Sequence, residues 1–313
     1  MSDRSALHRA PAVQLAHDVR SYRKLFILGC PRSGTTWVRS ILAEHPDVVS
    51  GAESHVFGAF FGAASAASER PRWRADVLRR FDERAAVAES RMGGGGPQRW
   101  IAREALEELL ARIGDDDVRR GEAARHLIGG ILDAYFMANG GGPGKVLVEK
   151  TPAHLMHARR ILAWWPDARC IELVRDGRDV CVSLEHKSRV ASWAPAGREE
   201  QARTWAEAVR AGAALRTDPA IADRWHMIRY EDLRDRGTTE VRSLFRFAGL
   251  PHDEAMIALV VDSTSFARAQ RPGNADHVRK GAVGEWRSHF DETDLDTFRR
   301  VAGSLLADHG YEE

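Results

Sequence analysis

Short apolar runs alternate with helix-like segments along most of this 313-residue chain. Each run has the length and continuity of a buried strand in a parallel sheet, and the runs lie at residues 25–30, 47–50, 145–150, 168–175 and 225–230. Helical patterns follow them at 35–45, 153–165, from 176, and at 238–249 and 292–308. Strands that alternate with helices predict an α/β fold, in which a central parallel β-sheet is flanked by helices.

Residues 56–140 depart from this alternation because their pattern is mostly helical. Glycine-rich breaks interrupt or follow the segment at 91–98 and 139–145. We interpret it as a helical insertion that, together with residues 188–200, borders a ligand pocket. Three phenylalanines at 55–64 fit either the core or an apolar entrance. Residues 1–22 have the pattern of a tail or short helix, and we expect a single domain over 1–313.

Composition narrows the range of partners. The chain has 46 basic and 45 acidic residues, a formal net charge of +1, so nothing global favours nucleic acid or an anionic membrane. Three cysteines, Cys30, Cys170 and Cys181, do not make a disulfide framework. No stretch approaches the ~20 apolar residues of a membrane span, and the first residues lack the apolar block of a signal peptide. We expect a cytoplasmic enzyme.

The stretch G-C-P-R-S-G-T-T at 29–36 has the spacing of a phosphate-binding loop, G-x-x-x-x-G-K-[ST], between a strand and a helix. Its glycines let backbone N–H groups turn inward, and the helix adds its positive dipole end. Threonine at position 35 replaces the lysine that nucleotide hydrolases use. The cation is Arg32 instead, and a planar guanidinium suits a bidentate grip on phosphate or sulfate oxygens.

The segment PRSGTTW at 31–37 resembles the 5′-phosphosulfate loop of sulfotransferases that use 3′-phosphoadenosine 5′-phosphosulfate (PAPS). The resemblance implies a P-loop-like α/β fold and sulfuryl transfer without a metal, with PAP (3′,5′-ADP) as product. It further implies that the 5′-phosphosulfate is held by Arg32, Ser33, Gly34, Thr35 and Thr36. Trp37 stands where the family commonly stacks an aromatic ring on adenine, although it would also serve as a helix-packing residue.

Three later segments are similar to the same family and follow in its order. At 170–187, Arg175 and Ser183 have the separation of the family's 3′-phosphate motif. At 277–290 the chain resembles the family's C-terminal segment, whose basic turn closes over that phosphate and here reads Arg279, Lys280 and Gly281. Tyr230, at a strand end, matches a tyrosine that lies near the adenine in relatives.

The resemblance also implies catalytic groups. Lys150 follows a predicted strand, as does the family's lysine near the bridging oxygen, and ligands bind at such strand ends. Glu53 matches the glutamate that some relatives use as general base, and it would need burial to raise its pKa from ~4.3 toward neutral pH. His55 and His154 are the alternative bases, since cytosolic relatives use a histidine two positions before His154.

Two other function classes remain open from the sequence. A small-molecule kinase or nucleotide hydrolase on the P-loop plan would need the missing lysine and a magnesium-binding aspartate. A non-catalytic nucleotide-binding protein on the same fold would not need Arg32, Lys150 and Glu53 together. The expected acceptor is a hydroxyl on a small molecule, lipid or sugar. The sequence leaves open the acceptor's identity, sulfation of an amine, and the oligomeric state.

Overall fold

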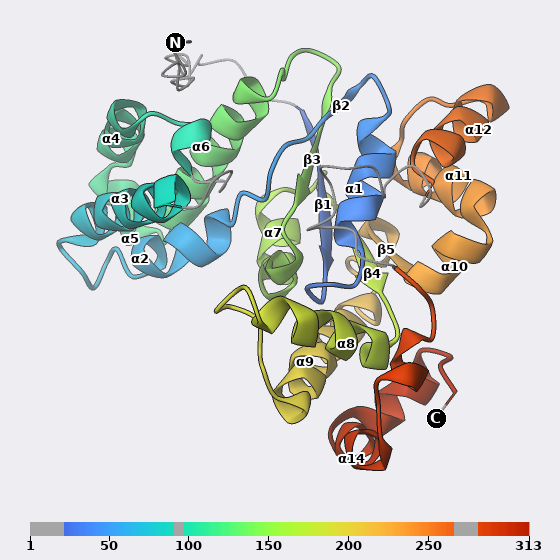
Figure 1. The fold of residues 1–313 in the computed structure, drawn as a ribbon. Coiled ribbons are helices and arrows are strands. Elements are labelled where there is room, and N and C mark those ends of the chain that lie inside the picture. Colours follow the sequence, from blue (N-terminus) through green and yellow to red (C-terminus); the bar gives the residue numbers. More distant parts are fainter. Residues whose placement is uncertain (1–21, 91–96, 266–280, 313) are drawn as a thin grey trace, which may run out of the picture. The chain divides into compact units, whose positions relative to one another are not determined.

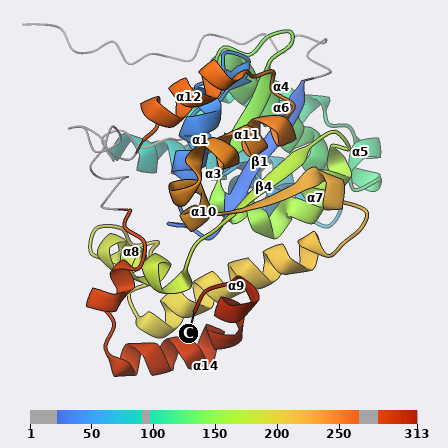
Figure 2. The same cartoon turned by 90° about the vertical axis from the view of Figure 1, so that its right-hand side faces the viewer.

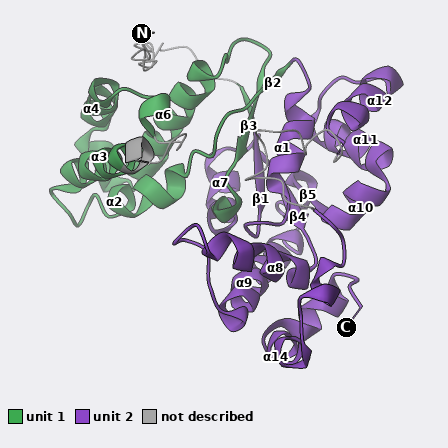
Figure 3. Cartoon of the chain, viewed as in Figure 1, with its two compact units in different colours: residues 1–24, 47–154 green, residues 25–46, 155–313 purple. Residues whose placement is uncertain are grey.

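The computed structural model describes residues 22–90, 97–265 and 281–312, with backbone only at 87–90. Backbone contacts divide the chain into two compact units (Figure 3). Unit 1 comprises Met1–Lys24 and Asp47–His154, and unit 2 comprises Leu25–Pro46 and Leu155–Glu313. The single-domain prediction for 1–313 stays a prediction.

A parallel five-stranded sheet carries the fold, in the order β2-β3-β1-β4-β5. Its strands are β1 (Arg23–Gly29), β2 (Val48–Val49), β3 (Val146–Lys150), β4 (Arg169–Val174) and β5 (Trp225–Arg229). In unit 2, Leu25 pairs with Arg169 and Cys170 with Trp225; in unit 1, Val48 pairs with Val146. All residues of β3 and most of β1 and β4 are buried, which explains their continuous apolar runs. The predicted fold class is confirmed.

Helices of unit 1 fill most of the predicted insertion and gather in one cluster (Figure 1). They are η1 (Phe57–Phe61), α2 (Gly62–Ser65), α3 (Trp73–Ser90), η2 (Pro97–Arg99), α4 (Arg103–Arg112), α5 (Asp115–Arg119) and α6 (Ala123–Ala138). Phe57 and Phe60 are 1% exposed, so two of the three phenylalanines at 55–64 belong to the core. Trp100 packs edge-on against Tyr135 of α6, with ring centroids 4.9 Å apart.

Unit 2 contains the remaining helices of the described chain, apart from a short 3₁₀ segment at 152–157 that belongs to both units. They are α1 (Thr35–Ala43), α7 (Ala158–Trp164), α8 (Gly177–Ser188), α9 (Arg198–Arg216), η4 (Ala222–Arg224), α10 (Tyr230–Asp235), α11 (Gly237–Ala248), α12 (Glu254–Ser263), η5 (Glu285–Ser288) and α14 (Glu292–Asp308). Helices α8, α9 and α14 lie side by side (Figure 2) and share a core that includes Val180, Trp205 and Phe298. None of the helices in the described segments combines the length and apolarity needed to cross a membrane.

Element boundaries differ from the predictions in a few places. The predicted helix at 153–165 begins as η3 (Pro152–His157), a 3₁₀ segment that straddles the two units, and becomes α-helical only at Ala158. Tyr230 opens α10 rather than ending β5. Helices α9 and α12 were not predicted. In α9, charged residues interrupt the apolar positions that include Trp205, Val209 and Leu215, which weakens the apolar pattern of the segment.

Candidate active site

The loop between β1 and α1 is shaped by close backbone packing. Gly29, Arg32 and Gly34 all have positive φ angles, of 144°, 74° and 103°. A Cβ at Gly29 would lie 2.5 Å from the Leu173 carbonyl oxygen, and one at Gly34 would lie 2.7 Å from the Tyr230 ring. Both positions therefore require glycine. The loop leads into the amino end of the nine-residue helix α1, where backbone N–H groups lack helical partners and favour an anion.

The hydroxyl groups predicted to face the anion have different environments. Ser33 is fully buried, and its hydroxyl donates to the Cys30 carbonyl oxygen at 2.7 Å. That hydroxyl stabilises the turn, so the contribution of Ser33 to an anion site rests on its main chain. Thr35 is buried in the first turn of α1, whereas Thr36 is half-buried.

The arginine of this loop meets the serine of the second motif. Arg32 donates from Nε to the Ser183 hydroxyl of α8 at 3.0 Å. Arg175, at the end of β4, donates from Nη1 to the Arg32 carbonyl oxygen at 3.4 Å. Ser183 and Arg175 are each 6% exposed. The structure thus brings together three of the predicted nucleotide-binding residues within unit 2.

Arg175 combines several contacts with one unused donor. Its Nη2 donates to the Ala282 carbonyl oxygen at 2.9 Å, and its guanidinium lies over the Tyr230 ring, 4.5 Å from the centroid. Trp205 of α9 donates from its indole to the Arg175 carbonyl oxygen at 2.9 Å. The buried Arg175 Nε has no hydrogen-bond partner in the described part of the chain. A buried cationic N–H without an acceptor fits an anionic ligand at this position.

The C-terminal segment that begins at Gly281 is held against the same strand ends. Tyr230 and Arg234 both donate to the Gly281 carbonyl oxygen, each at 2.8 Å. Asp179 of α8 accepts from the backbone N–H groups of Gly284 at 2.8 Å and Trp286 at 2.9 Å. Burial raises the pKa of Asp179, and the nearby Arg175 opposes that rise. The other two predicted residues of this turn, at positions 279 and 280, lie outside the described residues.

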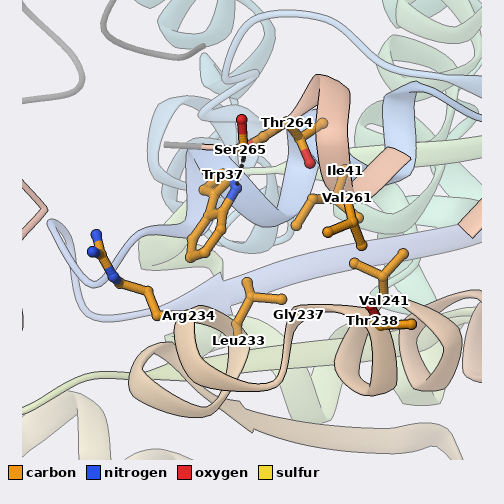
Figure 4. Close-up of a pocket in the computed structure, with 10 residues that line it drawn as sticks. All are labelled: Trp37, Ile41, Leu233, Arg234, Gly237, Thr238, Val241, Val261, Thr264 and Ser265. Carbon is orange, nitrogen blue, oxygen red and sulfur yellow. Dashed lines mark hydrogen bonds between the residues drawn. The ribbon is translucent and has the colours of Figure 1, made fainter. Parts of the chain in front are cut away.

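A cavity of about 250 Å³ adjoins this cluster, and Trp37 forms part of its lining (Figure 4). The Trp37 indole donates to the Thr264 carbonyl oxygen at 2.9 Å and contacts Tyr230 edge-on, with centroids 5.6 Å apart. The rest of the lining is mainly apolar and comes from α1, α10, α11 and α12, including Ile41, Leu233, Val241 and Val261. Arg234 supplies a cation at its edge (Figure 4).

The predicted catalytic pair lies in unit 1. Lys150 is the last residue of β3, and its side chain is 6% exposed. It is hydrogen-bonded to the Glu53 carboxylate. The other Glu53 oxygen lies 3.1 Å from His55 Nε2. Burial raises the pKa of Glu53, but the hydrogen bond from His55 and the charge of Lys150 lower it more, so the net pKa falls below its ordinary value. Two basic neighbours thus outweigh burial at Glu53, and its role as general base stays a prediction.

The two alternative bases have different surroundings. The His55 side chain is 46% exposed, and its backbone has a φ of 50°, in the left-handed region. His154 is 1% exposed, and its Nδ1 lies 3.0 Å from Glu149 Oε2. Its ring packs edge-on against Phe57, with centroids 5.0 Å apart. His154 therefore belongs to the interior of unit 1, while Glu53 and His55 retain exposed surface.

Residues 24–254 match the model of the Sulfotransferase family. This chain belongs to the sulfotransferase family. It is 25% identical to Nodulation protein NoeE of Sinorhizobium fredii over 310 residues, which cover 92% of this chain and 66% of that protein. It is also 25% identical to Protein-tyrosine sulfotransferase 1 of Danio rerio, over 92% of this chain and 72% of that one. This chain thus spans slightly less than two thirds of the length of NoeE.

Solved structures support the fold of this sulfotransferase. The sulfotransferase domain of the Synechococcus PCC 7002 olefin synthase superposes with a TM-score of 0.54 at 22% identity, over 91% of this chain and 94% of that one. The sulfotransferase domain from the curacin biosynthetic pathway gives a TM-score of 0.52 at 19% identity, over 94% and 99%. These likenesses concern the fold alone.

Sequence reasoning missed several residues around the site of this sulfotransferase. Asp179 was visible as the second acid of RDGRD, but its backbone partners lie more than a hundred residues away. Thr264 contacts Trp37 through its main chain, which no side-chain motif reveals. Glu149 precedes Lys150 in a strand and had the pattern of a simple strand residue.

One group of side chains in unit 1 has the spacing of metal ligands. Asp117, Glu122 and His126 place one ligand atom each within 4.8 Å of one another. Arg120 pairs with both acids, at 2.9 Å in each case, so both carboxylates already have a basic partner. We assign no metal to this group.

Proposed function

We propose that this sulfotransferase moves a sulfuryl group from PAPS to a hydroxyl group on a small molecule, lipid or sugar. The observation that carries the proposal is the meeting of Arg32, Ser183 and Arg175 at the ends of β1 and β4. One nucleotide with anionic groups at both its 5′ and 3′ positions would use the glycine loop and the two guanidinium groups together.

Each part of the donor has a group of residues suited to it. The 5′-phosphosulfate would be held by the loop from Arg32 to Thr36 and the amino end of α1. The 3′-phosphate would be held by Arg175 and Ser183, and the unused Arg175 Nε supports this assignment. Adenine would lie against Trp37 in the adjoining cavity, near Tyr230. Gly281 would close the 3′ side through the main-chain contacts of its segment.

The reaction requires the protein to hold the leaving phosphate, to neutralise the charge on the leaving oxygen and to accept the acceptor's proton. The acceptor oxygen forms a bond to sulfur while the bond from sulfur to the phosphate oxygen breaks, and the acceptor's proton must be removed. Arg32 and Lys150 would neutralise the charge that develops on the leaving oxygen. Glu53 would accept the proton; its lowered pKa keeps it ionised near neutral pH, ready to act as a base but with modest strength.

The kinase or nucleotide-hydrolase alternative is disfavoured by the loop itself. Thr35, at the position of the missing lysine, is 4% exposed. Its buried side chain does not replace an ammonium group that must reach the β- and γ-phosphates.

The proposal for the donor is tested by comparing nucleotides in titration calorimetry. The wild-type chain should bind 3′,5′-ADP more tightly than ADP, because only the former carries the 3′-phosphate. Arg175→Ala should weaken 3′,5′-ADP binding by about 1.5–3 kcal/mol, as expected for a charged hydrogen bond. ADP is the internal control, and its affinity should change little. Equal affinity of the wild type for both nucleotides would contradict the assignment.

The acceptor stays a prediction, as does a cytoplasmic location. The relative from Danio rerio is a protein-tyrosine sulfotransferase by name, so a phenol on a peptide is a useful comparison for this chain. Incubating a metabolite panel and a tyrosine peptide with PAPS, followed by mass spectrometry for sulfate gain, would identify the acceptor class. A panel without any sulfated product would count against catalysis.

A further inference from the structure

A buried carboxylate organises the catalytic end of β3. Glu149 is 0% exposed and accepts hydrogen bonds on both oxygens. Its Oε1 accepts from the Ser54 N–H at 3.1 Å, the Ser54 hydroxyl at 2.8 Å and the Thr151 hydroxyl at 2.6 Å. Its Oε2 faces His154 Nδ1 at 3.0 Å. Four contacts are enough to keep this carboxylate ionised in the interior.

The partners of Glu149 are neighbours of the residues to which we assign catalysis. Ser54 follows Glu53 directly, and Thr151 follows Lys150. The Thr151 hydroxyl also accepts from the His55 N–H at 3.3 Å. The carboxylate therefore ties the turn at 53–55 to the end of the strand that presents Lys150.

This turn needs such a tether because its backbone is strained. His55 adopts a left-handed conformation that costs free energy for a residue with a side chain. Conformations of this kind persist only where surrounding contacts over-determine them. Ser54 and His55 receive those contacts from Glu149 and Thr151.

His154 completes the arrangement on the other side of the carboxylate. Its ring lies between Glu149 and Phe57, and its Nε2 has no partner among the described residues. Because His154 is buried against this carboxylate, we interpret it as a support for Glu149.

We propose that Glu149 is a positioning residue, which holds the turn at 53–55 on the end of β3 so that Glu53 faces Lys150. This inference rests on the proposed function for the catalytic roles of Glu53 and Lys150. Glu149 itself touches no reacting atom; it acts through Ser54 and Thr151.

The kinetic test uses Glu149→Gln, which keeps the shape but removes the charge. We expect kcat to fall about tenfold to a hundredfold, as small misplacements of reacting groups do, with KM for PAPS unchanged within about twofold. Ser54→Ala, which removes one of the contacts to Oε1, should lower kcat in the same direction by less. If Glu149→Gln folds poorly, the kcat of Ser54→Ala still tests the inference.

The matched control is Glu172→Gln. Glu172 is also a buried strand carboxylate, in β4, where Arg216 donates to it at 2.6 Å and Trp225 at 3.0 Å. Its loss should lower thermal stability but leave kcat of the folded enzyme unchanged. An equal fall of kcat in both variants would reduce Glu149 to a general structural role and overturn the inference.

A second measurement is independent of turnover. Lys150 is nearly inaccessible and ion-paired in the wild type, so an amine-reactive reagent should label it slowly. Peptide mass spectrometry should show labelling several-fold faster in Glu149→Gln and unchanged in Glu172→Gln. Unchanged labelling of Lys150 in Glu149→Gln would overturn the positioning role. If the wild type transferred no sulfate while Lys150 labelling still rose, the proposed function would fail and the positioning of the pair would stand.

Discussion

Arg32 donates its Nε–H to the Ser183 hydroxyl at 3.0 Å, which joins the loop after β1 to helix α8. The two residues are 151 positions apart in the chain. They belong to the two segments that would hold opposite ends of the donor. The Arg32 side chain, which would bind the 5′ end, is thus oriented by a residue of the segment that would bind the 3′ end.

Ser183→Ala should weaken 3′,5′-ADP binding by about 1.5–3 kcal/mol, the range for a hydrogen bond to a charged group. The variant removes one donor to the 3′-phosphate and the acceptor of Arg32 Nε. Titration calorimetry measures the change. Ser188→Ala on the same helix, where the hydroxyl donates to the Glu185 carbonyl oxygen, is the control and should bind as the wild type does. A loss of the same size in both variants would point to helix damage.

Glu53→Gln should reduce turnover by about 10² or more while leaving 3′,5′-ADP affinity intact, because a base contributes to the chemical step. A rate assay with the acceptor found by mass spectrometry, run beside calorimetry, measures both. Glu69→Gln replaces an exposed glutamate of the same unit and should retain full activity. Retained turnover in Glu53→Gln, with turnover lost in His55→Ala, would transfer the role to His55.

Trp37→Ala should weaken 3′,5′-ADP binding by about 1–3 kcal/mol, the range for stacking of a base on an aromatic ring. Trp37→Phe keeps a ring but loses the hydrogen bond to the Thr264 carbonyl oxygen. Its affinity for 3′,5′-ADP should therefore lie between those of the wild type and Trp37→Ala. Ribose 3,5-bisphosphate lacks the base and should bind all three proteins alike. If Trp37→Ala weakened the binding of ribose 3,5-bisphosphate as strongly as that of 3′,5′-ADP, Trp37 would be a packing residue of α1.

Acid should selectively remove the stabilisation from Glu149. Burial raises the pKa of this carboxyl. The charge of His154 and the hydrogen bonds from His154, Thr151 and Ser54 lower it by more, so the net pKa falls from 4.5 to about 2. Because the folded-state pKa is depressed, the stabilisation is complete above pH 4.5 and disappears as the pH falls toward 2. In urea unfolding, the stability gap between wild type and Glu149→Gln should therefore narrow over that range.

Glu231 supplies the control of opposite sign. Burial raises its pKa above the ordinary value despite the hydrogen bond from the Asp176 N–H. The wild type should therefore gain stability relative to Glu231→Gln as the pH falls. Parallel behaviour of the two variants would mean that the pH dependence comes from the whole chain rather than from these carboxyls.

The sequence was most informative where one segment carries both the structure and the chemistry. The strand–loop–helix at 24–43 could be predicted because apolar continuity, glycine spacing and the basic residue occur together. Arg175 and Ser183 belong to one strand–helix unit, so their spacing was also visible. The sheet followed from the same short-range patterns.

Long-range contacts were beyond such reasoning. Asp179 binds main-chain N–H groups of residues 284 and 286, which leave no trace in side-chain chemistry. The pKa of Glu53 depends on two basic neighbours that only the folded turn brings to it. The role of α9 could not be predicted, because the contact from the Trp205 indole to the Arg175 carbonyl oxygen joins two segments that are far apart in the sequence.

The residue that position 34 of the loop can accept depends on the aromatic residue at position 230, far along the chain. Because the Tyr230 ring occupies the space that a Cβ would need, position 34 cannot acquire a methyl group unless position 230 first becomes smaller. The positive φ of Gly34 adds a second barrier to that exchange. A smaller residue at position 230 would therefore relieve the clash but not the backbone strain, so laboratory evolution that varies position 230 should still retain glycine at position 34.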